Sequence, residues 1–367
     1  MTIFKPLSAD DRVSTKTLLH EAIPITGTIV SGTYADGNIQ NFTHGMFQSV
    51  YDYPFLSSSA NHIFDITFGT SATSGLAVTN QIAKKDNVYN QMAQVLMGYD
   101  QNGVIQKFDE DGDLTTTGDK LNDVSFLSFS RLLSKDEIKK GSFELELGVS
   151  ASYSDNTFGN RIKITDFGAA TSYKVNSPAG EYGILYATAS AGTGILDTAS
   201  THTSSLSDSN VYWKAGLIYY QAGVVVLTSS FFMKTADGGY LSEATVLDYD
   251  GAGTSFTGSL ISQEISGAAD HLRHRIYNLQ FNNTIELNST VYFCRAKHNE
   301  FNYSANPTYL SGSQIRVKNQ GTDTPVSYIT SIGLYSADNQ LLAVGKFSEP
   351  IRKDSNIELT FRARLDY

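Results

Sequence analysis

The chain has 367 residues, 41% of them hydrophobic and 17% charged, so it can bury a sizeable core without cross-links. Its net charge of −10 argues against a nucleic-acid partner, because such proteins usually neutralise phosphate with a basic surface. One cysteine cannot form an internal disulfide, and no apolar run approaches the roughly 20 residues of a membrane span. The N-terminus lacks the apolar segment of a signal peptide, so we expect a globular protein that is made in a cytoplasm.

The first 45 residues carry scattered prolines and glycines without sustained periodicity, and we expect them to form an extended arm. Residues 46–140 read as a mixed α/β region with a strand at 62–69. The segment 84–98 predicts an amphipathic helix, capped at Asp86 or Asn87 and ended by Gly98. Its expected apolar stripe consists of Val88, Met92, Val95 and Leu96.

The segment 134–141 predicts a second helix, because Ser134 and Glu137 have the spacing of a capping box. Residues 141–260 then read as a β-rich, sandwich-like domain with strands at 142–149, 161–167 and 181–187. A hairpin over 216–232 is expected to turn at 221–223, and the Ser- and Thr-rich stretch 187–210 predicts a long loop.

Residues 261–367 complete the predicted organisation. A helix is expected to begin near Ala268. Strands at 326–335, 340–347 and 356–367, with a turn at Ser336–Asn339 and a break at Glu349-Pro350, predict a three-stranded antiparallel meander. The last of these strands alternates, with Ile357, Leu359, Phe361, Ala363 and Leu365 on one face. The expected fold class is mainly β, with antiparallel, sandwich-like sheets, a few short helices and long loops.

The most reactive-looking stretch contains Cys294, His298 and Glu300. A thiol nucleophile needs a base within hydrogen-bond reach, but on a strand Cys294 and His298 would lie roughly 13 Å apart. The residues around Cys294 match no cysteine-hydrolase signature, and a free cysteine usually behaves as a small buried hydrophobe. We therefore expect no catalytic role for it.

The acidic stretch 109–120 contains the best candidates for metal binding. Asp109, Asp111 and Asp113 occupy positions 1, 3 and 5 of a calcium loop. Leu114 stands where that loop needs glycine, and Lys120 stands where it needs a bidentate glutamate. An acidic hairpin tip is the preferred interpretation, and we expect no resident metal or cofactor.

His271 and His274, beside Asp270, have helical i, i+3 spacing but no visible third ligand, so they predict a solvated polar helix face. The glycines of 251–258 do not have the spacing of a nucleotide-binding loop, and we read that segment as a plain loop. With no serine-hydrolase elbow, zinc-protease motif or convincing carboxylate pair, the sequence predicts that the protein is not an enzyme.

Several segments resemble virion structural proteins of T4-related contractile-tailed bacteriophages, especially those of marine bacteria. The resemblance touches about half of the chain and rests on residues 44–69, 88–98, 132–148, 216–228 and 297–351. A shorter similarity to baseplate wedge subunits lies in "IFDITFG" and "NIELTF".

This resemblance implies a structural subunit of the virion that is tail-associated, at the baseplate wedge or the neck. It would bind copies of itself and other virion proteins, after production in the host bacterial cytoplasm. Aromatic residues are favoured interface anchors, and the candidates are Tyr51, Tyr53, Phe55, Phe301, Tyr303 and Tyr309. The alternatives are a capsid decoration protein or carbohydrate-binding module that uses the 187–210 loop and, more remotely, a cysteine hydrolase.

Overall fold

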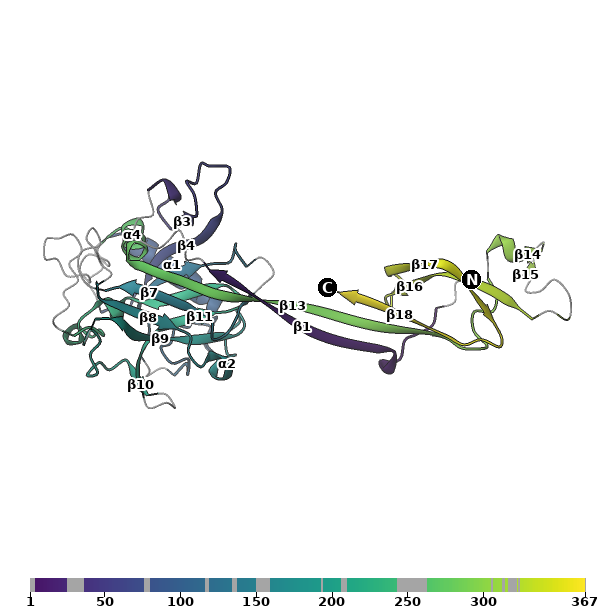
Figure 1. The fold of residues 1–367 in the computed structure, drawn as a ribbon. Coiled ribbons are helices and arrows are strands. Elements are labelled where there is room, and N and C mark those ends of the chain that lie inside the picture. The colour runs from purple at the N-terminus through teal and green to yellow at the C-terminus, as the bar shows by residue number, and fades with distance from the viewer. Residues whose placement is uncertain are drawn as a thin grey trace. The chain divides into compact units, whose positions relative to one another are not determined.

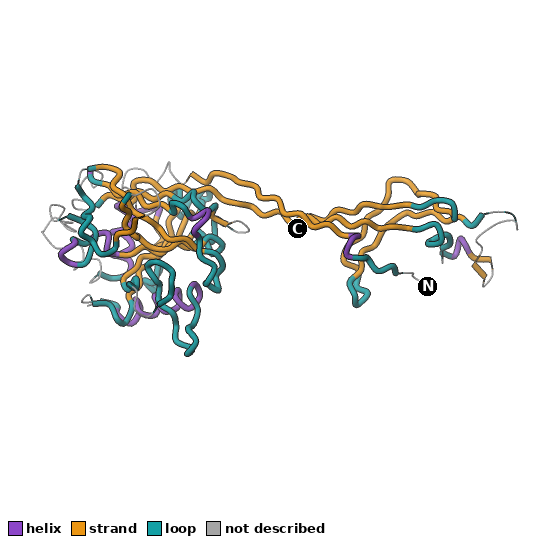
Figure 2. Tube along the Cα trace, turned by 90° about the horizontal axis from the view of Figure 1, so that it is seen from below, coloured by secondary structure: helices purple, strands orange, loops and turns teal. Residues whose placement is uncertain are grey.

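The computed structural model describes residues 4–24, 36–75, 80–115, 119–133, 137–149, 159–192, 194–205, 210–242, 263–304, 306–311, 314–315, 322 and 324–366. Strands form 45% and helices 16% of the structure, in large antiparallel sheets with few short helices (Figures 1 and 2). The expected mainly β fold class is therefore confirmed. Among the described residues, no helix has the length and apolar character needed to cross a membrane.

The chain divides into two compact units. The smaller unit comprises Met1–Leu19 and Glu286–Tyr367, and the larger unit comprises His20–Ile285. The expected boundaries at residues 45, 140 and 260 all lie within the larger unit. The smaller unit combines segments from both ends of the chain, whereas each region expected from the sequence was a single continuous segment.

One long sheet dominates the larger unit. Its strands follow one another in the order β13 (Ile276–Ala296), which begins in this unit, β7 (Glu144–Gly148), β8 (Arg161–Thr165), β9 (Tyr182–Ala191), β11 (Val211–Tyr219), β12 (Val224–Thr228), β5 (Asp123–Ser128), β4 (His62–Thr70), β3 (Gln48–Tyr51) and β2 (Ile39–Asn41). Two short strands, β6 (Glu137–Ile138) and β10 (Thr203–Ser205), pair with β13 and β11. The strands expected at 62–69, 142–149, 161–167 and 181–187, and the hairpin turning at 221–223, are confirmed.

The sheet of the larger unit bends around an aromatic core. Five strands separate β5 from β13 in the sheet, yet Phe129, directly after β5, contacts Phe281 on β13 with ring centroids 5.1 Å apart. Phe129 also contacts Phe64 on β4, at 5.7 Å. These contacts require distant parts of the sheet to face one another across shared apolar side chains, which is how a curled sheet buries one face.

Among the described residues of the larger unit, the helices are α1 (Ile82–Leu96), α2 (Ala169–Ser172) and α4 (Ile265–Arg275), and short 3-10 helices span Asp36–Asn38, Ser229–Phe232 and Thr235–Asp237. Helix α1 packs against β4 at Gly69, where an added Cβ would lie only 2.9 Å from the backbone nitrogen of Tyr89. A side chain at position 69 would therefore push the helix away from the sheet.

Helix α1 confirms the helix expected over 84–98, with differences in its cap and its buried face. It follows Gln81, which has a left-handed φ of 49°, and not Asp86 or Asn87. Val88 and Leu96 are buried as expected, whereas Val95 is 66% exposed. Tyr89 and Ala93 are buried in its place, so the buried stripe is rotated around the helix axis and leaves Val95 on the solvent side.

Two other predictions about the larger unit need correction. The helix expected at 134–141 is wrong at Glu137–Ile138, which form β6 opposite Asn283 and Thr284, because burial of Ile138 outweighs the local capping pattern. Residues 134–136 lie outside the described part of the chain. The loop expected at 187–210 holds the end of β9 and all of β10, so it is shorter than the composition suggested.

In the smaller unit, β1 (Arg12–Pro24) and β18 (Leu359–Asp366) both pair with β13. The strands β16 (Val326–Tyr335) and β17 (Leu341–Asp354) form a separate hairpin around the expected turn at 336–339. A second small hairpin joins β14 (Leu310–Ser311) and β15 (Gln314–Ile315), and 3-10 helices span Ala9–Asp11 and Pro307–Tyr309.

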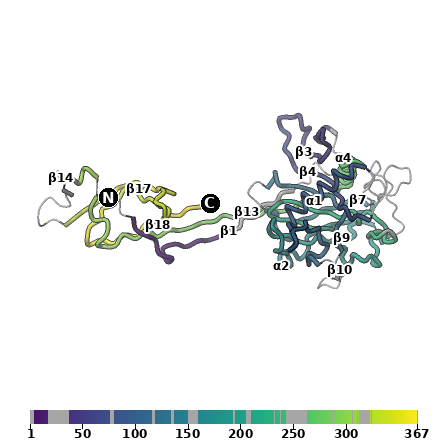
Figure 3. The backbone as a smooth tube through the Cα atoms, turned by 180° about the vertical axis from the view of Figure 1, so that it is seen from behind, coloured from purple at the N-terminus to yellow at the C-terminus, as the bar shows by residue number. Residues whose placement is uncertain are grey.

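The expected three-stranded meander is wrong in its pairing. Strand β18 runs beside β13 (Figure 3) and hydrogen-bonds to it, and not to the β16–β17 hairpin. It packs against that hairpin through Phe361 and Phe347, with ring centroids 4.8 Å apart. Glu349-Pro350 does not end β17 but lies where its register with β16 shifts. An irregularity of this kind accommodates a proline that cannot donate to the ladder.

Candidate functional site

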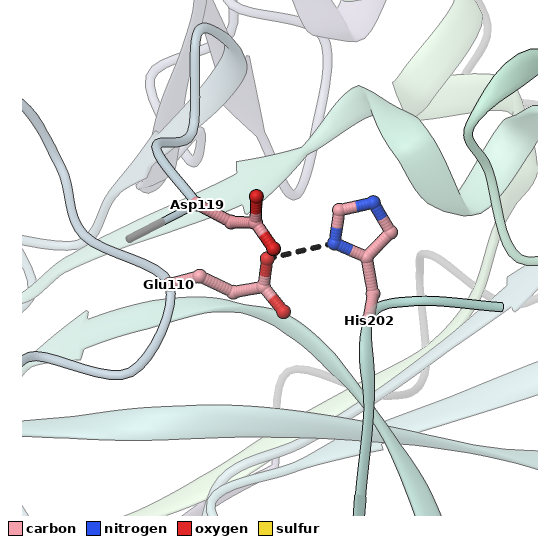
Figure 4. Close-up of side chains that lie close together, drawn as sticks. All are labelled: Glu110, Asp119 and His202. Atoms are coloured by element: carbon pink, nitrogen blue, oxygen red, sulfur yellow. Dashed lines mark hydrogen bonds and ion pairs between the residues drawn. The ribbon is translucent and has the colours of Figure 1, made fainter. Parts of the chain in front are cut away.

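The larger unit brings together Glu110, Asp119 and His202, a group that the sequence did not single out (Figure 4). An isolated bridge between Asp109 and Lys120 pairs the two sides of the acidic loop, and the backbone N–H of Glu110 donates to the carbonyl of Asp119 at 3.1 Å. His202 directly precedes β10 and reaches the same place from a distant segment. One ligand atom from each residue lies within 4.8 Å of the others.

Hydrogen bonds fix both nitrogens of the His202 ring. Nδ1 lies 2.7 Å from Oε2 of Glu110, and Nε2 lies 3.2 Å from the carbonyl oxygen of Gly238. The hydrogen bond to Glu110 raises the pKa of His202, although burial of the ring acts in the opposite direction. Lys214 Nζ lies 3.5 Å from the other carboxylate oxygen of Glu110, Oε1.

A cavity of about 170 Å³ adjoins this cluster. Glu110 and His202 are among its lining residues, together with Asp123, Thr228 and Met233. Burial raises the pKa of Asp123 to about 6, against the effect of a hydrogen bond from Ser74 and the charge of Lys85. Most of the residues that line the cavity are polar, and it is large enough to hold several water molecules.

Asp109, Asp111 and Asp113 also come together, with ligand atoms within 4.8 Å of one another. However, the ammonium group of Lys120, the residue at position 12 of the pattern, forms an ion pair with Asp109. Asp109 also accepts the backbone N–H groups of Asp111 and Gly112, at 3.1 and 2.9 Å. The loop thus satisfies this carboxylate internally, as an acidic turn does. The expectation that it holds no metal stays a prediction.

Cys294 lies on β13 opposite Phe361, so its placement on a strand is confirmed. Burial raises the pKa of its thiol, which disfavours the thiolate that a nucleophile needs. His298 lies beyond the end of β13 and its Nδ1 is 3.2 Å from Glu358. These contacts give a thiol–imidazole mechanism no support.

His271 lies on α4 and is only 1% exposed, so the solvated helix face predicted for it is wrong. Burial and the nearby charges of Arg275 and His274 lower its pKa to about 2. Asp270, on the same helix, pairs with Arg273 at 2.6 Å and accepts a hydrogen bond from Gln48 on β3. The polar residues of α4 thus join the helix to the sheet.

The candidate interface aromatics fall in both units. In the larger unit, Tyr51 donates to Gln40 at 3.0 Å and its ring lies 6.3 Å from that of Phe55, whereas Tyr53 is 55% exposed. In the smaller unit, Phe301 and Tyr309 are half-buried and Tyr303 is exposed. Whether these residues contact a partner stays a prediction.

A second candidate surface is provided by the strands of the smaller unit. Among its described residues only two apolar side chains, Val291 and Ala296, are buried, and none belongs to the connected hydrophobic core of the chain. The exposed large apolar residues of its β16–β17 hairpin are Tyr328, Tyr335, Leu341, Leu342 and Val344. Sequence reasoning missed them, because an apolar run does not reveal whether another part of the chain covers it.

Comparisons of this chain with family models, with curated proteins and with solved structures found no match.

Proposed function

We propose that this chain is a structural subunit of a tailed-phage virion, tail-associated at the baseplate wedge or neck, and acts through contacts with copies of itself and other virion proteins. The virion setting rests on the sequence resemblance. The assembly role rests on one structural observation, the uncovered apolar surface of the smaller unit. Among its exposed residues, Leu342 is 69% and Val344 is 61% accessible to solvent.

The energetics of folding favour a partner for this surface. Ordering a residue costs roughly 1.5 kcal/mol of conformational entropy, and burial of an apolar side chain returns about 1.5–3 kcal/mol. The described part of the smaller unit buries two apolar side chains, Val291 and Ala296. Burial against a neighbour supplies the stabilisation that the unit lacks by itself.

The arrangement of β18 favours a second copy of the chain as one neighbour. Its apolar face, from Leu359 to Leu365, is only half-buried. Its opposite face exposes charges of both signs, from Glu358, Arg362, Arg364 and Asp366. Mixed charges can pair with the same surface of another copy, as a symmetric interface requires.

The test is self-association of the purified chain, measured by sedimentation velocity. Val344→Lys places a charge on the proposed surface, and Val104→Lys provides a matched control, because Val104 in the larger unit is also 61% exposed. We expect Val344→Lys to weaken association by at least about tenfold, or 1.4 kcal/mol, and Val104→Lys to leave it unchanged. Two observations together would overturn the assembly role. The parent chain would be monomeric, and the backbone amides of its smaller unit would nevertheless be protected from hydrogen exchange.

Cross-linking mass spectrometry of intact particles tests the location. We expect cross-links from the smaller unit to further copies and to tail proteins. Cross-links to the major capsid protein alone would contradict the tail assignment and favour a decoration protein.

A further inference from the structure

We propose that Glu110, Asp119 and His202 form a binding site for a divalent transition-metal ion of the Zn²⁺ type. The site offers one imidazole nitrogen and two carboxylate oxygens, and zinc sites with an open position commonly have three protein ligands. Two ligands on one tetrahedral zinc ion lie about 3.4 Å apart, since each is about 2.1 Å from the metal. The ligand atoms here are within 4.8 Å of one another, so small side-chain rotations bring them to that distance.

A buried carboxylate oxygen points independently to a cation. Glu110 is 2% exposed, and its Oε1 accepts no hydrogen bond from the described part of the chain. Lys214 Nζ forms an ion pair with this oxygen at 3.5 Å, without hydrogen-bond geometry, and lies 3.8 Å from Asp111 as well. A buried charged oxygen without a donor costs free energy that coordination to a metal would recover.

The hydrogen bond between His202 and Gly238 orients the imidazole for coordination. Histidine ligands usually donate their second ring N–H to a carbonyl or carboxylate, which fixes the tautomer. Here Nε2 is 3.2 Å from the carbonyl oxygen of Gly238, which leaves Nδ1 directed at Glu110. Because both ring nitrogens face acceptor oxygens, binding of the ion would release the proton shared by Nδ1 and Glu110 to solvent and replace that hydrogen bond with two bonds to the metal, one from each residue.

The cavity beside the cluster provides the remaining coordination position. It measures about 170 Å³ and is lined by Glu110 and His202, so water can reach the ion from that side. An imidazole ligand selects transition metals over Ca²⁺ and Mg²⁺, which prefer oxygen. The neighbouring group of Asp109, Asp111 and Asp113 offers carboxylates and no imidazole, so it is less suited to a transition-metal ion.

The bound ion would join two segments that are distant in the sequence. Glu110 and Asp119 lie on the acidic loop, whereas His202 lies between β9 and β10, much later in the sequence. A metal bridge between them would stabilise the larger unit, and its presence is independent of the proposed assembly role. Failure of self-association and failure of metal binding are therefore separate outcomes.

The test is titration of the full chain with Zn²⁺, followed by calorimetry and thermal unfolding. We expect one equivalent to bind and to raise the melting temperature. His202→Gln and Asp119→Asn should each weaken binding by at least about 100-fold. Asp113→Asn is the matched control in the adjacent acidic group and should bind Zn²⁺ like the parent chain. Asp119 is exposed, so its substitution tests the site without endangering the fold.

Co²⁺ absorption supplies a second readout that does not depend on stability. Co²⁺ bound in place of Zn²⁺ should give visible absorption bands typical of a site with a nitrogen ligand, and His202→Gln should remove these bands. Absence of stoichiometric Zn²⁺ binding in the parent chain would overturn the proposal. So would unchanged affinity in His202→Gln and Asp119→Asn, or loss of binding in Asp113→Asn alone, which would place the ion on the neighbouring loop.

Discussion

The charges of Lys85 and Asp123 permit a quantitative test of the interior of the larger unit. Lys85 is fully buried on α1, and burial lowers its pKa from 10.5 to about 8, although the charge of Asp123 opposes this shift. The remaining shift corresponds to a net cost of roughly 3 kcal/mol for keeping the ammonium charged in the fold. The attraction between the two charges offsets part of this cost, so the pair is expected to show measurable coupling without large net stability.

A double-mutant cycle with Lys85→Met and Asp123→Asn measures that coupling. At pH 7.5, where both groups are charged in the folded state, we expect a coupling free energy of about 1–3 kcal/mol. At pH 5 the coupling should fall below about 0.5 kcal/mol, because the folded-state pKa of Asp123, about 6, lies above that pH and the carboxyl is protonated.

The direction of the pH dependence follows from the same pKa values. Burial raises the pKa of Asp123 from 3.8 to about 6, so between these values the folded chain binds a proton that the unfolded chain does not. The contribution of Asp123 to stability therefore increases as pH falls from about 6 to 4, and Asp123→Asn should abolish this increase. For Lys85, with its pKa lowered to about 8, the contribution increases as pH rises from about 8 to 10.5.

Urea unfolding at constant ionic strength is the appropriate assay. Trp213, the single tryptophan of the chain, is 7% exposed in the larger unit and reports its unfolding by fluorescence. Equal coupling at pH 5 and pH 7.5, or no coupling at either pH, would refute the charge-pair reasoning.

Two further predictions concern the backbone and the aromatic residues. Gly216→Ala should destabilise the larger unit by about 3 kcal/mol or more in urea unfolding, because φ is +149° and an added Cβ would lie 1.9 Å from the carbonyl oxygen of Val226. Gly159→Ala, also in the larger unit, where a Cβ meets nothing within 4 Å, should change stability by less than about 1 kcal/mol, and equal effects would contradict the clash. Tyr303→Ser and Tyr309→Ser should each weaken self-association at least about threefold with unchanged circular dichroism, and loss of the fold would mean a role in folding instead.

Local sequence patterns predicted about half of the described strands, because alternation with period two is set by the residues of the strand itself. They did not predict the partners of those strands. The segment 326–367 reads as a continuous meander, yet β18 pairs with β13, about 70 residues earlier in the chain. Local reasoning also failed at Glu137–Ile138, where a capping pattern is outweighed by pairing with Asn283 and Thr284.

The candidate metal site was beyond sequence reasoning for a related reason. The alternation of Asp109, Asp111 and Asp113 drew attention to one side of the acidic loop, whereas Glu110, between them, is the residue that meets His202. His202 lies 92 residues away, inside a stretch whose composition predicts a loop. The feature that marks Glu110 is its burial, and the sequence does not reveal that position 110 is buried.

Two strands with the same sequence pattern have different surroundings, and the difference bears on assembly. In the larger unit, the alternate residues Phe143, Leu145, Leu147 and Val149 are at most 1% exposed. In the smaller unit, the equally regular apolar face of β18 is only half-buried. Alternation specifies which face of a strand avoids water, but not which molecule covers that face. The covering layer of β7 comes from its own chain. The β16–β17 hairpin covers β18 only in part, through Phe347 against Phe361. We infer that a neighbouring subunit covers the rest, so that the apolar residues of β18 should be protected from solvent in the assembly as fully as those of β7.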